Sequence, residues 1–229
     1  MRMLGLIGGI APESTIAYYR QLVEGFRQRD PGRYPRIVIN SIEMTSMRLL
    51  VEAGDLAGLT KFLAAEIAIL AAAGAELGAF ASNTPHLVFD AVARQSAIPL
   101  VSIVEVTAAH VAQLGLRRVG LLGARFTMEA PFYPEVLGAR GITVVTPPRE
   151  DRDEIHRIYF DELVHGDFRP ESRAVLLGCI ERLHQRENVE AVILGGTELP
   201  LILDEDSGVV PLLDTTRIHV AALLERAWE

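Results

Sequence analysis

The sequence of 229 residues contains a single cysteine, Cys179. One cysteine excludes a disulfide within the chain and a cysteine-rich metal site. The surrounding residues, AVLLGCIERL, have the apolar spacing of a helix, so we expect Cys179 to be a buried and inert thiol. The six histidines show neither HxxxH nor HExxH spacing, and carboxylates are not grouped with them. A metal site is therefore not expected.

Basic clusters and long apolar runs are also missing. The chain has 22 Lys and Arg against 30 Asp and Glu, a net charge of −8, which argues against a surface for nucleic acid or anionic membranes. The apolar stretch at 62–73 contains Glu66 and is shorter than the roughly 20 residues of a membrane span. The start, MRMLGLIGG, has too short an apolar run for a secretory signal. We expect a cytoplasmic protein.

Apolar runs typical of strands alternate with helical patterns, which predicts an α/β fold with mostly parallel sheets. A helix is expected after Asp55, which is a plausible N-cap, with a stripe at Leu56, Leu59, Leu63, Ile67 and Leu70 and a left-handed residue at Gly74. The expected strands cover residues 3–8, 36–41, 76–81 and 98–103 in a first half, and residues 117–123, 141–146, 190–195 and 208–213 in a second half.

The two halves resemble each other. LGLIGGIAPEST at 4–15 aligns with VGLLGARFTMEA at 119–130, and LGAFASNTP at 77–85 aligns with AVILGGTELP at 191–200. Such a repeat indicates a duplicated unit and two pseudo-symmetric domains, each with a sheet flanked by helices. We predict domains at 1–100 plus 209–229 and at 101–208. Because ligands bind beyond the carboxyl ends of parallel strands, we expect a cleft between the domains.

The loops after the expected strands carry the candidate chemistry. GLIGGIAPEST offers backbone N–H groups around Gly9 and a helix that starts near Pro12, an arrangement that suits a carboxylate or phosphate. A tight turn without a ligand is one alternative; a dinucleotide site with Glu43 on the ribose is another, although neither GxGxxG nor a Walker A loop is present. SNTPH and GTELP supply hydroxyl and amide groups that hold carboxylates. For either loop alone, the alternative is that its polar side chains cap a helix. The two loops occupy equivalent positions in the internal repeat, and this favours a binding site.

Several motifs occur together along the chain: GLIGGIAPESTIAYY, ASNTPH, VGLLGARFTMEAPFY, VHGDF, ILGGTELPL and LLDTTRIHVAAL. In their order and spacing the chain resembles the aspartate/glutamate racemase superfamily over nearly its whole length. The resemblance implies inversion at the α-carbon of an acidic amino acid without a cofactor, in a cleft between two pseudo-symmetric α/β domains. It also implies a homodimer.

The catalysts of the family are two cysteines, and by this resemblance they correspond to Ser82 and Gly196. Inversion needs a proton acceptor on one face of the carbon and a donor on the other. Neither Ser82 nor Gly196 supplies a thiol, so we do not expect racemisation by two thiols. Two hypotheses stay open. One is an isomerase-type enzyme that uses Ser82, His86 or Glu198 with bound water, since serine needs a partner to act as a base. The other is a catalytically silent ligand-binding or regulatory protein.

The recognition residues match the family pattern more closely. By resemblance, Asn83, Thr84, Thr127 and Thr197 hold the amino-acid head group. Arg48 supplies a planar cation for a side-chain carboxylate. A family lysine corresponds to His165, whose charge titrates near neutrality and leaves the side-chain specificity open. The predicted ligand is a small carboxylate, and the predicted binding residues are Gly9, Pro12, Arg48, Asn83, Thr84, Thr127, His165 and Thr197.

Overall fold

The computed structural model describes all 229 residues. The chain forms two compact units, one of Met1–Ile103 with His219–Glu229 and one of Val104–Ile218. Each unit contains one four-stranded sheet. The predicted boundaries gave residues 209–218 to the first domain, whereas the structure places them in the second unit, because strand β8 (Leu212–Asp214) pairs with β7 (Ala191–Leu194).

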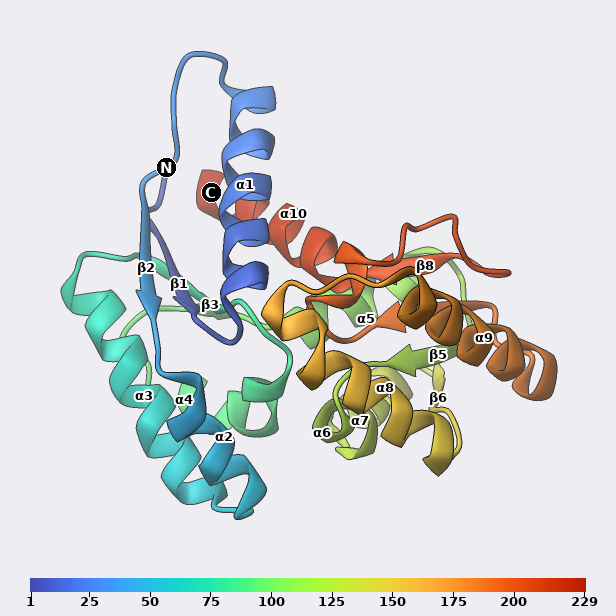
Figure 1. Cartoon of the computed structure of the whole chain (residues 1–229). Helices are drawn as coiled ribbons and strands as arrows, with labels where there is room; N and C mark the ends of the chain where they lie inside the picture. Colours follow the sequence, from blue (N-terminus) through green and yellow to red (C-terminus); the bar gives the residue numbers. More distant parts are fainter. The chain divides into compact units, whose positions relative to one another are not determined.

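The sheet of the first unit is parallel throughout and has the strand order β2-β1-β3-β4 (Figure 1). Strands β1 and β3 are buried along their whole length. Burial on both faces explains why their sequences are almost purely apolar rather than alternating. The four strands predicted for the first half are confirmed. They are β1 (Leu4–Gly8), β2 (Ile37–Ser41), β3 (Leu77–Phe80) and β4 (Leu100–Val101).

Helices cover both faces of this sheet. Figure 1 shows α1 and α10 on one side and α3 on the other. The rings of Phe26 on α1 and Trp228 on α10 stack with centroids 4.6 Å apart. The helical elements are α1 (Pro12–Arg29), α2 (Met44–Glu52), α3 (Leu56–Ala72), the 3₁₀ helix η1 (Thr84–Val88), α4 (Phe89–Ala93) and α10 (Thr215–Trp228), whose residues from His219 onward belong to this unit.

The ends of α3 lie where the sequence predicts them. The carboxylate of Asp55 accepts a hydrogen bond from the N–H of Gly58 at 2.8 Å, and Gly74 has φ +92°, so both predicted caps are confirmed. The predicted apolar stripe is buried except at Leu56, which is 49% exposed at the first residue of the helix. Pro12 occupies the first turn of α1, where its missing N–H costs nothing.

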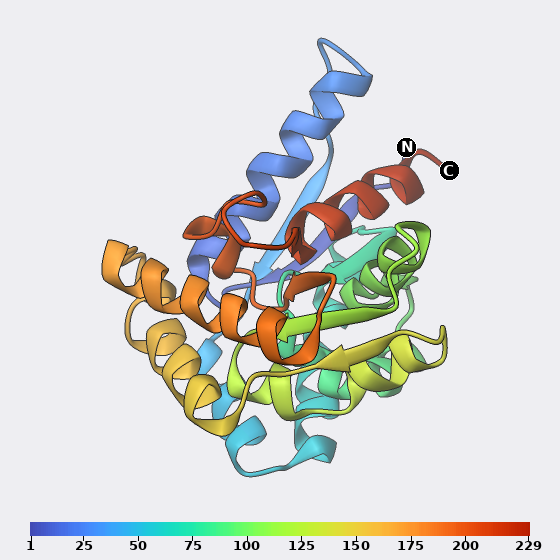
Figure 2. The same cartoon turned by 90° about the vertical axis from the view of Figure 1, so that its right-hand side faces the viewer.

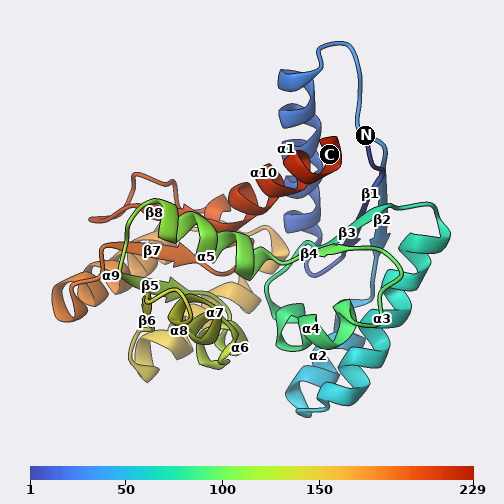
Figure 3. The same cartoon turned by 180° about the vertical axis from the view of Figure 1, so that it is seen from behind.

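The second unit repeats the first. Its sheet is parallel with the order β6-β5-β7-β8, the same pattern as β2-β1-β3-β4, which explains the internal repeat of the sequence. The gold and orange helices α8 and α9 lie side by side in Figure 2, linked by the ion pair of Asp151 and Arg182. Helix α5 covers the opposite face of the sheet (Figure 3). The further strands are β5 (Arg118–Leu122) and β6 (Thr143–Val145). The helical elements are α5 (Ile103–Gln113), α6 (Arg125–Glu129), α7 (Phe132–Gly138), α8 (Arg149–Asp161), η2 (Leu163–His165), α9 (Pro170–Glu187) and η3 (Leu199–Leu201).

The composition of the helices also bears on membrane insertion. No helix in the structure is both long enough and apolar enough to span a bilayer.

Candidate functional site

The strand order fixes where each unit can place a ligand. In both sheets the direction of winding reverses between the two central strands, β1 and β3 in the first unit and β5 and β7 in the second. Ligands of open parallel sheets bind beyond the carboxyl ends of the strands at this reversal. The four predicted loops, at residues 8–12, 81–86, 123–127 and 195–198, follow these four strands. The structure therefore brings the predicted loops together in pairs, one pair in each unit.

The glycine loop of the first unit is tightly packed. Gly9 has φ +81°, and a Cβ atom there would lie 2.4 Å from the carbonyl oxygen of Ile42, so only glycine fits. The N–H group of Gly9 donates to the hydroxyl of Thr15 at 2.9 Å. The sequence suggested that this N–H faces a ligand, but it already has a partner within the chain. What the loop contributes is the close turn that carries the chain into α1 at Pro12.

The second loop of this unit is organised by His86. Ser82, Asn83 and His86 are all buried, and the turn between them is helical. The backbone N–H of Ile103 donates to Nε2 of His86 at 3.1 Å, so Nδ1 carries the proton and donates to the carbonyl of Asn83 at 3.2 Å. Burial lowers the pKa of His86 to about 3. The lone pair of the ring is thus used by the backbone, which argues against His86 as the base for Ser82.

A second buried histidine, His219, holds the neighbouring backbone of the same unit. Its Nε2 donates to the carbonyl of Val101 at 3.1 Å, and its Nδ1 accepts the hydroxyl proton of Tyr18 at 2.8 Å. Burial lowers the pKa of His219 to about 3, with a smaller contribution from His86. His86 and His219 therefore fix the segment 101–103 from both sides as neutral rings. Their role in the structure is to hold this segment.

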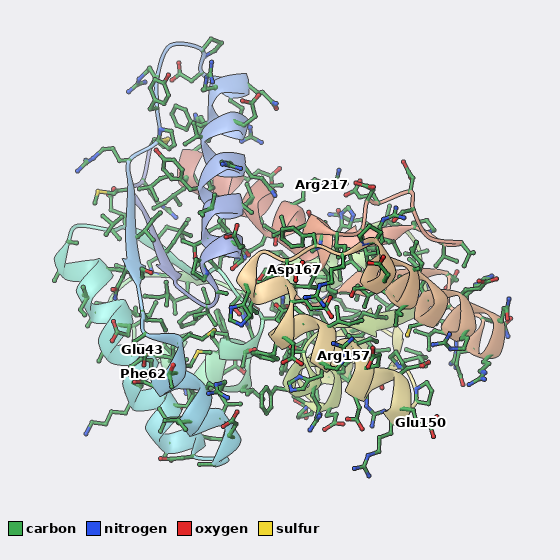
Figure 4. All side chains as sticks on the ribbon, in the orientation of Figure 1. Glu43, Phe62, Glu150, Arg157, Asp167 and Arg217 are labelled. Carbon is green, nitrogen blue, oxygen red and sulfur yellow. The ribbon has the colours of Figure 1, made fainter.

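The charged candidates of the first unit lie on the helix after β2. Arg48 is exposed on α2 and forms an ion pair with Glu52 at 3.0 Å. Glu43 lies at the start of α2 (Figure 4) and accepts hydrogen bonds from the N–H groups of Thr45 and Ser46. Bonds from Ser46 and then from Thr45 lower the pKa of Glu43 to about 2. Because the carboxylate caps its helix, the dinucleotide alternative loses its proposed ribose ligand.

In the second unit, the space beside Gly196 is filled by a tyrosine. A Cβ atom on Gly196 would lie 2.4 Å from Cε2 of Tyr159 and 3.2 Å from the hydroxyl oxygen. Tyr159 comes from α8, where it is buried with Ile155 and Ile158. Tyr159 is not among the site residues predicted from the sequence. Its contact with residue 196 was missed, because nothing in the pattern indicates which loop a helix face covers.

The hydroxyl of Tyr159 is paired with the predicted catalytic carboxylate. It donates to Oε2 of Glu198, and the hydroxyl of Thr197 lies 3.1 Å from the same oxygen. Glu198 is fully buried, and Thr197 and Thr127 are nearly so. Burial and the charge of Glu198 raise the pKa of Tyr159 well above 10, so the phenol is protonated at neutral pH. The loop after β7 thus contains a buried carboxylate with two hydroxyl donors.

Two buried polar atoms near this edge of the second sheet have no partner within the chain. They are the hydroxyl oxygen of Thr216 and the Nε atom of Arg125. Thr216 follows β8, next to Thr215, whose hydroxyl bonds the carbonyl of Leu194 at 2.7 Å. Arg125 begins α6 directly after β5. An unsatisfied buried polar group costs about 1–3 kcal/mol, so two at one edge point to a ligand that satisfies them. Sequence analysis predicted neither residue.

His165 is exposed at the end of η2, directly before Gly166, which has φ +73°. The turn is held by Glu162, whose carbonyl accepts the N–H of His165 at 3.0 Å. The buried carboxylate of Glu162 pairs with Arg157 at 3.0 Å and accepts the hydroxyl of Ser172. Figure 4 shows Arg157 on α8 and Asp167 in the segment that follows this turn.

Cys179 is buried on α9, as the sequence predicts, and burial with the nearby charge of Asp151 raises the pKa of its thiol to about 11. A thiol of this pKa is a poor nucleophile and base at neutral pH. No group of three or more His, Cys, Asp or Glu side chains is arranged to hold a metal ion.

The sequence profile of the Asp/Glu/Hydantoin racemase family matches residues 7–223. The chain belongs to this family. Membership is established over nearly the whole chain, which confirms the predicted resemblance.

Solved structures give the same assignment. A Yersinia pestis protein provisionally described as an Asp/Glu racemase is 34% identical, with full coverage of both chains and a TM-score of 0.89. An aspartate racemase homologue from Pyrococcus horikoshii OT3 is 40% identical, again over both whole chains, with a TM-score of 0.85. A glutamate racemase from Francisella tularensis in complex with D-glutamate shares the fold at 19% identity, covering 99% of this chain and 81% of that one, with a TM-score of 0.73. The predicted α/β fold with two sheet-containing units is therefore confirmed.

Proposed function

We propose that this racemase-family chain binds a small carboxylate, such as an acidic amino acid, with loops that follow the strands of its parallel sheets. The observation that carries the proposal is the pair of unsatisfied buried atoms, Thr216 Oγ1 and Arg125 Nε, at the carboxyl edge of the second sheet. A guanidinium nitrogen and a hydroxyl are donors suited to a carboxylate. The buried side chains of Asn83, Thr127 and Thr197 supply further polar groups on the predicted loops.

The proposal does not include racemisation by two thiols. The chain has one cysteine, and Cys179 is buried on α9 with a raised thiol pKa. Ser82 and Gly196 hold the two positions that the family resemblance assigns to cysteine. The proposal includes a homodimer that needs no metal or cofactor, as the resemblance implies. Light scattering of the purified chain tests the dimer.

A second candidate is a catalytically silent binding protein. The observation that favours it is the ring of Tyr159, which fills the space that a side chain at residue 196 would need. A tyrosine packed in this way leaves no room for a second thiol. Both candidates predict ligand binding, and they differ in whether the bound carboxylate exchanges its α-proton.

Binding is tested by calorimetry with the enantiomers of aspartate and glutamate. Thr216→Val removes the unsatisfied hydroxyl while preserving the shape of the side chain. We expect the variant to unfold no more easily than the parent chain, and to bind the preferred ligand about 10- to 150-fold more weakly, since a hydrogen bond to a charged group contributes about 1.5–3 kcal/mol.

Thr60→Val is the matched control, because the hydroxyl of Thr60 is exposed and bonds the carbonyl of Leu56 within α3. Its affinity is expected to equal that of the parent. Absence of binding for all four amino acids contradicts the proposed substrate class. Unchanged affinity in Thr216→Val contradicts the assignment of the site to this edge.

A further inference from the structure

We propose that Tyr159, backed by Glu198, is the group that exchanges the α-proton of the bound carboxylate, and that it acts on one face only. The proposal rests on the proposed function, since it needs a bound substrate with an acidic Cα–H bond. It assigns a catalytic role to Tyr159, which is not among the site residues predicted from the sequence.

The geometry around Gly196 supports this role. The hydroxyl oxygen of Tyr159 lies 3.2 Å from the position that a Cβ atom of residue 196 would take. The phenol from α8 therefore provides the functional group that the loop after β7 lacks at this position. Glycine is required there, because a larger residue would displace the ring.

A proton acceptor lies directly behind the phenol. The hydroxyl of Tyr159 donates to Oε2 of Glu198, and the hydroxyl of Thr197 is 3.1 Å from the same oxygen. Glu198 is fully buried at 0% exposure, whereas Tyr159 is 7% exposed. The phenol is thus the less deeply buried member of the pair, and in the proposed transfer the carboxylate behind it stores the proton. A weak acid becomes a competent base when a neighbouring group takes its proton.

The proton transfer balances within this pair. The phenolic oxygen of Tyr159 takes the proton from the α-carbon while the original phenolic proton passes to the carboxylate of Glu198. The electron pair of the broken Cα–H bond stays on the substrate as an enolate. Before the return step, the proton on the phenol exchanges with a proton of solvent water. The phenol then gives this solvent-derived proton to the carbon, and the proton on Glu198 passes back to the phenol, which restores the carboxylate. No oxidant, metal or other co-reactant takes part.

No base is assigned to the opposite face of the substrate. The ring of His86 uses its lone pair for the N–H of Ile103, so it does not take the proton of Ser82. The proton therefore returns to the face from which it left. The expected outcome is exchange of the α-proton with solvent and retention of configuration, in contrast to inversion.

The test follows the α-proton of the bound enantiomer in deuterium oxide by NMR, with the enantiomeric purity measured in parallel. We expect the parent chain to incorporate deuterium without loss of purity. Tyr159→Phe keeps the ring beside Gly196 and removes only the hydroxyl, and should slow exchange by about 100-fold or more with affinity within threefold of the parent, since general base catalysis contributes about 10²–10⁴-fold. Tyr133→Phe, which alters another fully buried tyrosine of the second unit, is the matched control and should exchange at the parent rate.

Three results would overturn the inference. The first is binding by the parent chain without any exchange, which leaves the proposed function standing and removes the relay. The second is unchanged exchange in Tyr159→Phe. The third is inversion as fast as exchange, which requires a group on the opposite face. A chain that binds none of the amino acids overturns both the proposed function and the inference.

Discussion

Replacing Gly196 by alanine should destabilise the protein. The backbone of Gly196 is not among those with positive φ, so alanine meets no backbone strain there. By itself, such a change stabilises a protein by about 0.4–1 kcal/mol, because it restricts the unfolded chain. The added Cβ atom, however, would lie 2.4 Å from Cε2 of Tyr159, where ordinary contacts begin at 3.4 Å. The ring must retreat by about 1 Å, and overpacking of this kind costs about 1–3 kcal/mol.

The retreat also breaks the hydrogen bond between Tyr159 and Glu198. When a buried carboxylate loses a hydrogen-bond donor, the free energy of unfolding falls by a further amount of roughly 1–3 kcal/mol. After the gain from the unfolded chain is subtracted, we expect Gly196→Ala to lower the free energy of unfolding by about 2–4 kcal/mol. Urea unfolding followed by circular dichroism measures this difference. Gly138→Ala, at an exposed position on α7 where a Cβ atom meets nothing within 4 Å, is the control and should be neutral or stabilising.

A double-mutant cycle isolates the contact itself. Tyr159→Leu removes the two ring carbons and the hydroxyl oxygen that approach residue 196. In that background Gly196→Ala should cost nothing, so the coupling energy between the two positions should be about 2 kcal/mol or more. A Gly196→Ala variant as stable as the parent, or an equal cost in both backgrounds, would refute the packing argument. The same result would weaken the case for Tyr159 as the functional group at this position.

The same contact governs whether thiols can be restored. Ser82→Cys with Gly196→Cys should not racemise aspartate or glutamate while Tyr159 is intact, and adding Tyr159→Leu should create measurable inversion in a chiral assay; inversion by the double variant alone would contradict this. Stability should also fall in acid, because His86 and His219 have a pKa of about 3 when folded and 6.5 when unfolded. The unfolded state binds more protons between these values, so each histidine should cost about 2 kcal/mol at pH 5 relative to pH 8. Urea unfolding across this range checks the slope, and a flat profile between pH 7 and pH 5 would show that the rings are not buried as neutral groups.

Much of the fold is encoded locally and was predictable. Alternation of apolar runs with helical spacing identified all eight strands, because burial on both faces requires continuous apolar segments. The caps at Asp55 and Gly74 follow from short-range backbone chemistry, which the sequence displays directly. The repeat predicted two similar units, and the common strand order confirms it. The limits of the domains were harder to predict from the sequence, because the pairing of β8 with β7 depends on contacts between segments that are distant along the chain.

The candidate site divides in the same way. Its loops were predictable, because they follow strands that the pattern identifies. The hydrogen-bond partners of the side chains in these loops were not predictable. The sequence marked His86 as a candidate partner of Ser82, but it does not reveal that the N–H of Ile103 occupies the ring nitrogen. Nor does it reveal that Thr216 Oγ1 lacks a partner, which is known only when every neighbouring atom has been placed.

The sequence by itself determined the family, the two parallel units and the absence of thiols at residues 82 and 196. Each of these is a property of residue type and spacing along the chain. The tertiary structure decided that Tyr159 fills the space beside Gly196 and donates to Glu198. The physical reason is that close packing depends on distances of a few tenths of an ångström between segments far apart in sequence. A pattern of apolar residues reports which side of a helix is buried, and only the folded chain shows which atom that side meets.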